Sequence, residues 1–273
     1  MDYFTFLLSQ NLWDLWAVFL LGLGRMVTAI SMAPFLGGKI LPTSIKIGFG
    51  IAITLIFLPY LVLHSQSSYQ FDVLFMLLMV KETVIGFILG FLITIPFQYV
   101  QSAGSLIDHQ RGASSLQVMN PAMGAQSSPL GTLSNNIMVV IFFAIGGPIL
   151  FFQAIFATYQ VLPIDKFFPQ EFFSHTSPLY IMTMKMMTEI FRITIQLSAP
   201  SILAMLLSDL FLGIANRMAP QVQISFLLWS LKAFLGIAFV WLAWFYILKQ
   251  MDVEAHDFLK SFANVARHLN GKS

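Results

Sequence analysis

The sequence contains no cysteine and few charged residues. Only 10% of its 273 residues are Asp, Glu, Lys or Arg, whereas a soluble globular domain has about 25%. The lack of cysteine excludes disulfides, thiol catalysis and cysteine-ligated metal or iron–sulfur sites. The net charge is +2, and the basic residues are scattered singly, so we expect no nucleic-acid partner.

Apolar residues, by contrast, make up 58% of the chain, above the roughly 45–50% of a soluble domain. Runs of about 20 apolar residues predict transmembrane helices. Six such stretches occur, at Leu12–Leu36, Ile45–Leu63, Val73–Tyr99, Ile137–Val161, Leu179–Leu207 and Ile224–Leu248. No Lys or Arg precedes Arg25, so we expect the first stretch to stay in the mature protein rather than act as a signal peptide. The composition excludes an ordinary cytosolic enzyme and predicts an all-α membrane protein.

The stretch Ile137–Val161 contains Gly146-Gly147-Pro148 near its middle. Proline removes a helix hydrogen bond and the glycines add flexibility, so the helix is expected to bend or break there. Two readings remain: a kinked span, or a helical hairpin buried among protein neighbours. Ile45–Leu63 and Ile224–Leu248, by contrast, are expected to be ordinary spans.

Several charges lie inside the apolar stretches, where each costs about 2.5–3.5 kcal/mol. Lys185, Glu189 and Arg192 share one helix face and are expected to satisfy one another. Lys81 and Glu82 are adjacent, point about 100° apart on a helix, and are not expected to pair. Four residues therefore need polar partners from other helices, other chains or water: Arg25, Lys81, Glu82 and Lys232.

Two polar segments and a tail complete the chain. Gln101–Asn136 is rich in small polar residues but has only two formal charges, Asp108 and Arg111, which are three residues apart and could pair. A polar loop of this length is more often functional than an ordinary linker. Lys249–Ser273 has mixed charge and apolar residues at helical spacing, which predicts a short amphipathic helix on a membrane or a partner. We therefore divide the chain into a membrane domain, residues 1–248, and a tail, residues 249–273.

The sequence predicts no catalytic, cofactor or metal site. Its five histidines are dispersed, and neither a nucleophile elbow nor a Walker-type phosphate loop occurs. Gly86 and Gly90 form a GxxxG pattern, which lets two helix backbones approach closely.

Several motifs resemble those of the SctT/FliR family, membrane components of the type III secretion export apparatus. They include Arg25 and Ala33-Pro34-Phe35-Leu36-Gly37, then Gly104-x-Leu106-Ile107-Asp108-x-Gln110-Arg111-Gly112, then Pro121. They end with Asp209-Leu210-x-Leu212-Gly213-x-x-Asn216-Arg217-x-Ala219-Pro220-Gln221 and Leu231-Lys232. Flagellar members typically have a Gly-His-His-like element where this chain has Gly146-Gly147-Pro148, so the resemblance favours the virulence injectisome branch.

This resemblance implies a structural and gating subunit of an export gate in the bacterial inner membrane, rather than an enzyme. The implied partners are two smaller helical membrane proteins, SctR-like and SctS-like, large cytoplasmic export-gate proteins, membrane lipid and unfolded secreted polypeptides. Bent helical hairpins are implied, with part of the mass raised toward the periplasm and the tail in the cytoplasm.

The resemblance also assigns roles to individual positions. The gate loop would be Gln101–Asn136, and its functional residues would be Gly104, Asp108, Arg111, Gly112 and Pro121. Subunit packing would involve Arg25, Lys81, Glu82, Glu189, Asp209, Asn216, Arg217, Gln221 and Lys232.

Two other functions are weighed against this one. A secondary transporter for a small solute would use Lys81, Glu82, Glu189 and Arg192 as a site at the bilayer midplane. Transporters usually have two related halves, and no matching pair of interrupted segments is seen here. A membrane-embedded hydrolase would need a nucleophile and a base, and the sequence offers no credible pair.

Overall fold

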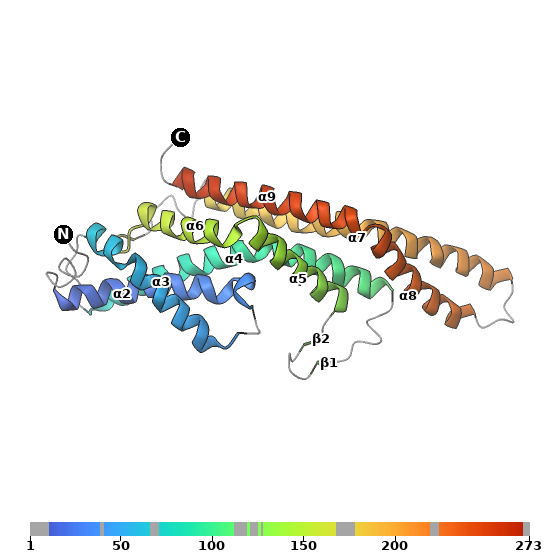
Figure 1. The fold of residues 1–273 in the computed structure, drawn as a ribbon, viewed down its shortest axis with the longest axis horizontal. Helices are drawn as coiled ribbons and strands as arrows, with labels where there is room; N and C mark the ends of the chain where they lie inside the picture. The colour runs from blue at the N-terminus through green and yellow to red at the C-terminus, as the bar shows by residue number, and fades with distance from the viewer. Residues whose placement is uncertain are drawn as a thin grey trace. The chain divides into compact units, whose positions relative to one another are not determined.

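A computed structural model describes residues 11–38, 41–65, 71–111, 119–120, 125–126, 128–167, 178–218 and 224–269. Nearly all of them are helical (Figure 1). The helices are α2 Leu12–Met32, α3 Thr43–His64, α4 Val73–Gln110, α5 Pro129–Ala144, α6 Gly147–Val161, α7 Pro178–Met218, α8 Ile224–Leu242 and α9 Trp244–Leu269. A 3-10 turn covers Pro34–Leu36, and two two-residue strands, β1 Met119–Asn120 and β2 Ala125–Gln126, pair antiparallel.

The helices confirm the predicted multi-pass membrane protein. Within the described residues, four helices are long and apolar enough to cross a bilayer: α2, α3, α4 and the part of α7 from Met184. Two bent pairs, α5 with α6 and α8 with α9, raise the number to six if each pair is one span. These six correspond to the six apolar stretches of the sequence.

The chain folds as two compact units. Unit 1 comprises Met1–Thr94, Gly146–Lys185 and Leu259–Ser273, and unit 2 comprises Ile95–Ile145 and Met186–Phe258. Three helices, α4, α7 and α9, contribute residues to both units. Each unit contains one of the two polar clusters described below.

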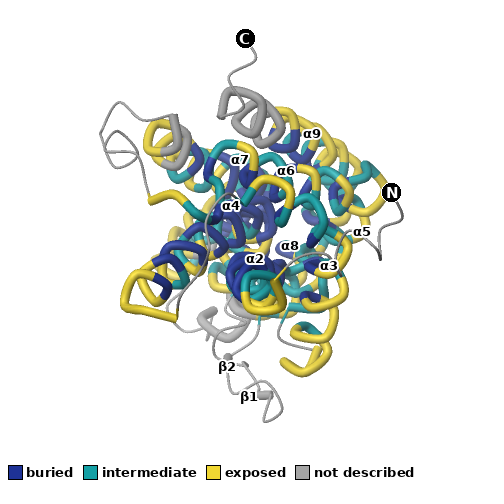
Figure 2. Tube along the Cα trace, turned by 90° about the vertical axis from the view of Figure 1, so that its left-hand side faces the viewer, coloured by how far each residue is buried: buried dark blue, intermediate teal, exposed yellow. Residues whose placement is uncertain are grey.

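Unit 1 is built around α2, which is largely buried, as is α4 (Figure 2). Small residues allow α3 to approach α2 closely, because a Cβ at Gly50 would lie 2.6 Å from a methyl group of Val27. Phe35 and Phe151 add an edge-to-face pair with ring centroids 5.4 Å apart. The close packing around α2 excludes solvent from the Arg25 side chain.

Unit 2 has a core in which Ile107, Met205 and Val240 are buried, with partly buried neighbours Leu130, Ile202 and Trp244. The expectation of an ordinary span at Ile224–Leu248 is wrong. The helix breaks after Leu242, and α9 continues at 59° to the preceding helix. The bend places Trp244, the first residue of α9, against the core.

The C-terminal helix is amphipathic, as predicted, but it begins at Trp244 rather than near Lys249. Within unit 2, Met251 and Ala255 on its apolar face are buried by the chain itself. An ion pair also joins it to α7, because Arg192 Nη2 lies 3.4 Å from Glu254 Oε1. The apolar face of this part of the helix therefore packs within the protein.

The predicted loop Gln101–Asn136 is shorter than expected. Helix α4 continues to Gln110, and α5 begins at Pro129. The polar residues 101–110 are helical because Ala103, Ile107 and Asp108 lie on one face and are buried. At the other end, Ser128 caps α5 by accepting a hydrogen bond from the Gly131 backbone N–H.

The predicted break near Gly146 is confirmed. Helix α5 ends at Ala144, and α6 begins at Gly147 with Pro148 in its first turn. Between them, Gly146 has a φ of 76°, in the left-handed region that side chains with a Cβ rarely adopt. The element is a bent pair of short helices rather than one straight span.

Replacing Gly146 with alanine is expected to lower the free energy of unfolding by about 1–2 kcal/mol, the cost of a left-handed conformation for an L-residue. No atom lies within 4 Å of the added Cβ, so the effect isolates backbone strain from steric clash. Thermal unfolding of the purified protein in detergent measures it. The matched control is Gly48→Ala, also in open space but inside α3 without a positive φ, which is expected to be neutral or stabilising. Equal effects of the two changes would contradict the assignment.

Candidate functional site

A fully buried ion pair joins α2 to α4 in unit 1. Arg25 donates from Nε to Glu82 Oε2 at 2.6 Å and from Nη2 to Oε1 at 2.9 Å, in a two-pronged arrangement. The exposed fraction of both side chains is 0%. Two parallel bonds to a carboxylate are the strongest arrangement that an arginine makes.

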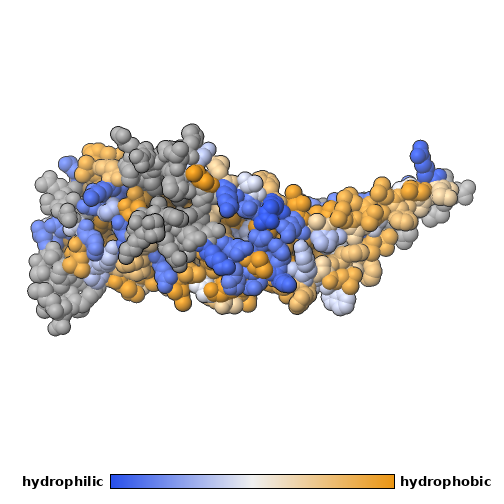
Figure 3. Space-filling view, turned by 90° about the horizontal axis from the view of Figure 1, so that it is seen from above, coloured by the Kyte–Doolittle hydropathy of each residue, from blue (hydrophilic) through white to orange (hydrophobic). Residues whose placement is uncertain are grey.

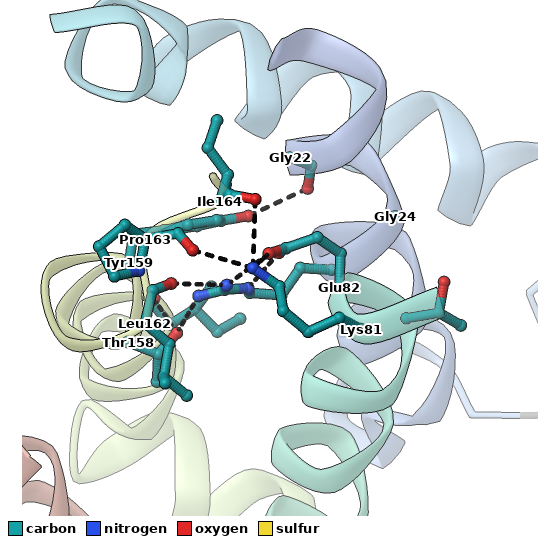
Figure 4. Close-up of polar contacts among 12 residues, drawn as sticks. Gly22, Gly24, Lys81, Glu82, Thr158, Tyr159, Leu162, Pro163 and Ile164 are labelled. Atoms are coloured by element: carbon teal, nitrogen blue, oxygen red, sulfur yellow. Dashed lines mark hydrogen bonds and ion pairs between the residues drawn. The ribbon is translucent and has the colours of Figure 1, made fainter. Parts of the chain in front are cut away.

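Lys81 joins the same cluster, contrary to the expectation that it would not pair with Glu82. Its Nζ lies 2.7 Å from Glu82 Oε1. The 100° separation of their Cα–Cβ bonds is overcome because both side chains are long and turn toward the same point (Figure 4). One carboxylate thus balances two buried cations.

Main-chain carbonyls complete the cluster. Lys81 Nζ donates to Pro163 O at 2.8 Å, Lys166 O at 2.9 Å and Ile164 O at 3.2 Å. Arg25 donates to Leu162 O at 2.9 Å. These carbonyls follow directly after the C-terminus of α6, the negative end of its dipole, so they offset the second positive charge.

Two side chains of α6 also contact Arg25. Thr158 Oγ1 accepts from Arg25 Nη1 at 3.0 Å, and the Tyr159 ring lies 4.1 Å from the guanidinium carbon. The Tyr159 hydroxyl donates to the carbonyl of Gly22 on α2 at 3.0 Å. The sequence analysis missed Thr158 and Tyr159, because neither residue type is unusual in an apolar helix and Thr158 lies 133 positions from Arg25.

Close backbone packing puts Glu82 within reach of Arg25. Gly86 lies one helical turn after Glu82, and a Cβ there would overlap the Arg25 carbonyl oxygen. At Gly90 a Cβ would lie 3.0 Å from Ala29 O. The GxxxG pattern therefore packs α4 against α2 within the chain, in agreement with its sequence signature.

A second buried carboxylate, Asp108, joins α4 to α5 in unit 2. Its Oδ1 accepts from Arg111 Nε at 2.7 Å, which confirms the local pair indicated by their spacing. Its Oδ2 accepts from the Leu130 backbone N–H at 2.9 Å and from the Ser128 hydroxyl. One side chain therefore contacts both ends of the segment between the two helices.

Glycine residues also allow α4 and α5 to approach each other closely. A Cβ at Gly104, one turn before Asp108, would lie 2.6 Å from Gly131 N. Of the predicted gate residues, Gly104, Asp108 and Arg111 are thus brought together at this junction. Gly112 and Pro121 lie outside the described residues.

The remaining predicted charges in unit 2 form two pairs. Lys232 of α8 lies 2.6 Å from Asp209 of α7, so the expected partner of Lys232 comes from a neighbouring helix. Arg192 pairs with Glu189, as predicted, and also with Glu254, whereas Lys185, which was expected to join them, is exposed and takes part in neither pair. These pairs are partly exposed, unlike the cluster around Glu82.

The end of α7 is exposed and strongly apolar. The large exposed side chains are Leu203, Leu206, Leu207, Leu210, Phe211, Ile214 and Met218. Together with α8, this end of α7 forms a helical hairpin. Its surface is mostly orange in Figure 3, at the right-hand end, where both helices also lie in Figure 1. Asn216 and Arg217 are exposed on the same segment, and Gln221 lies outside the described residues.

The charged groups that the transporter hypothesis names already have partners within their own units. Lys81 and Glu82 are engaged with Arg25 and carbonyls in unit 1, and Glu189 pairs with Arg192 in unit 2. Across the described ranges, no three His, Asp or Glu side chains gather closely enough to bind a metal ion.

Comparison with known proteins identifies the family. The model for "Bacterial export proteins, family 1" matches residues 16–257. The chain is 29% identical over 212 residues to Yop proteins translocation protein T of Yersinia pestis, covering 77% of this chain and 79% of that one. It is 32% identical over 183 residues to secretion system apparatus protein SsaT of Salmonella typhimurium, covering 66% and 68%. It is 30% identical over 211 residues to flagellar biosynthetic protein FliR of Bacillus subtilis, covering 77% and 80%. The chain therefore belongs to the SctT/FliR family of type III secretion export proteins.

Proposed function

We propose that this protein is a structural and gating subunit of the type III export gate, through which unfolded polypeptides cross the bacterial inner membrane. Family membership over residues 16–257 is the observation that carries the proposal. The similar proteins are named for Yop translocation, a secretion apparatus and flagellar biosynthesis, all of which concern export machines. We assign it no catalytic step, since the family consists of secretion apparatus components.

The partners in this proposal are an SctR-like and an SctS-like membrane protein, with large cytoplasmic export-gate proteins near residues 249–273. The exposed apolar side chains of α7 and α8 supply area for packing against partner helices. Asp209, Asn216 and Arg217 on the same hairpin suit protein contacts better than lipid, because charged groups facing lipid are costly. Gln221 completes this set in the proposal.

Arg25, Lys81 and Glu82 have a different place in the proposal. Their side chains are fully or almost fully buried, and their charged groups contact one another and main-chain carbonyls of the same chain. They support assembly by fixing the fold of unit 1, rather than by touching a partner.

The segment between α4 and α5 is the proposed gate loop. Its small, mostly uncharged residues suit a seal that yields to an unfolded polypeptide, and residues 112–127 contain no charge. The sub-branch is proposed to be the injectisome, from Gly146-Gly147-Pro148 at the helix break. Periplasmic placement of part of the complex belongs to the same proposal.

Native mass spectrometry of the tagged protein, extracted from native membranes in mild detergent, tests the assembly. We expect one copy held with several copies of two smaller helical membrane proteins. Deleting residues 112–118 from the assembled complex should then make the membrane permeable to ions. A monomer or a homo-oligomer would contradict the export gate and return attention to solute transport, and an unchanged seal after the deletion would contradict the gating role.

A further inference from the structure

The carboxylate of Asp108 divides its contacts between two helices. Oδ1 faces Arg111, the residue after α4, which donates from Nε at 2.7 Å and whose Nη2 lies 2.6 Å away. Oδ2 faces the start of α5, where it accepts from the Leu130 N–H and the Ser128 hydroxyl. From this geometry we propose that Asp108 is a positioning residue that holds the end of α4 against the start of α5 and so fixes the two ends of the gate loop. The inference rests on the proposed function and gives that loop a fixed anchor.

The electrostatics favour this arrangement. A negative charge at the N-terminus of α5 is stabilised by the helix dipole and by N–H groups that have no partner within the helix. Asp108 is fully buried, so its bonds to donors are not weakened by competing water. Arg111, the residue that follows α4, supplies the compensating charge, and its side chain is itself largely buried.

At the base of the loop, the backbones of α4 and α5 are packed too closely for one helix to slide along the other. Ideal Cβ atoms at Gly104 and Gly131 would each meet the opposite helix, with Gly131 N 2.6 Å from the first and Gln101 O 2.9 Å from the second. A third helix supports Arg111, because a Cβ at Gly236 of α8 would lie 3.2 Å from Arg111 Cβ. The contacts from α4, α5 and α8 thus fix the two ends of the loop.

The experiment compares Asp108→Ala with Ser128→Ala and a matched surface control, Asp252→Ala, in the complete complex. Asp252 is an exposed carboxylate in unit 2 that lies outside the junction. Ion leak through the assembled gate is measured by dissipation of a membrane potential in cells or vesicles. For Asp108→Ala we expect leak to rise roughly tenfold or more, which corresponds to about 1.4 kcal/mol. Ser128→Ala should have a smaller effect because Leu130 N–H still reaches Oδ2, and Asp252→Ala should have none.

Hydrogen exchange distinguishes a local loss of positioning at the start of α5 from a general unfolding of α4. The Leu130 and Gly131 amides donate to Asp108 and Ser128, respectively, so they should lose protection in Asp108→Ala while residues 95–107 of α4 keep theirs. Loss of protection throughout α4 would overturn the positioning role. An unchanged leak and unchanged exchange would overturn it as well.

Deletion of residues 112–118 distinguishes the two proposals. If the deletion leaks and Asp108→Ala does not, the gate loop stands and the anchor is wrong. If neither leaks, the gating role itself is wrong.

Discussion

Replacing Glu82 with glutamine is expected to destabilise the protein by about 3–5 kcal/mol, because it removes the carboxylate that contacts the two buried cations Arg25 and Lys81. Glutamine has nearly the same shape, so the loss comes from charge rather than from a cavity. Stabilities of folded proteins are only about 5–15 kcal/mol, and the variant should therefore accumulate poorly in membranes. Thermal unfolding in detergent, monitored by size-exclusion chromatography after heating, measures the change.

Glu189→Gln is the matched control, since Glu189 also pairs with an arginine. Its side chain is 36% exposed against 0% for Glu82, and exposed pairs contribute little. A second comparison replaces Arg25, Lys81 and Glu82 together by methionine, which should recover much of the lost stability because this ion cluster then leaves no unpaired buried charge. Equal effects of Glu82→Gln and Glu189→Gln would show that the cluster does not depend on its charge balance.

Adding one methyl group at Gly86 is expected to be as damaging as losing Glu82. The new Cβ would overlap the Arg25 carbonyl oxygen and lie 3.0 Å from the Arg25 carbonyl carbon. Main-chain atoms in two packed helices cannot turn aside as a side chain can, so α2 and α4 must separate. Overpacking commonly costs about 1–3 kcal/mol, and Gly86→Ala should reach or exceed the upper end of that range. The readout is the same thermal unfolding measurement.

Gly213→Ala is the control for this change. It also lies inside a helix, α7, but an added Cβ there has no atom within 4 Å. Alanine is favoured over glycine in a helix interior, so this variant should be at least as stable as the parent. Because separation of α2 and α4 also pulls Glu82 away from Arg25, Gly86→Ala and Glu82→Gln should be non-additive in a double-mutant cycle. Additive effects of the two substitutions on stability would contradict coupling between the packing at Gly86 and the Glu82–Arg25 ion pair.

Much of the fold could be predicted from the sequence. Apolar runs of sufficient length marked every helix that can span a bilayer, and Gly146-Gly147-Pro148 marked the break between α5 and α6. These features are local, since each depends on residues within one or two helical turns. The same holds for the pair of Asp108 with Arg111, which are three residues apart.

The partners of the buried charges could not be predicted in the same way. Arg25 and Glu82 are 57 positions apart, and Lys81 binds carbonyls more than 80 positions away. The sequence showed only that these residues needed polar contacts. Tertiary packing, and in particular the close approach of α2 and α4 at Gly86, decides which groups meet.

Helix ends were also missed where burial outweighs composition. Residues 101–110 are polar enough to suggest a loop, yet they continue α4 because Ala103, Ile107 and Asp108 are buried in unit 2. Conversely, the apolar stretch at Ile224–Leu248 is broken near Ala243, where the sequence has no glycine or proline that would predict a bend. In both cases, contacts with neighbouring helices rather than local helix propensity decide where the helix ends.

Lys81 and Arg25 bind the segment after α6 through its main-chain carbonyl oxygens, and Thr158 and Tyr159 of α6 contact Arg25 through their side chains. Every amino acid carries a carbonyl group, so selection can act strongly on Arg25, Lys81 and Glu82 while tolerating substitution at residues 162–164 and 166. Across the family, we therefore expect these four positions to vary in sequence while the segment keeps its path. A homologue in which those four residues differ, but the three charges persist, would fold its connection in the same way.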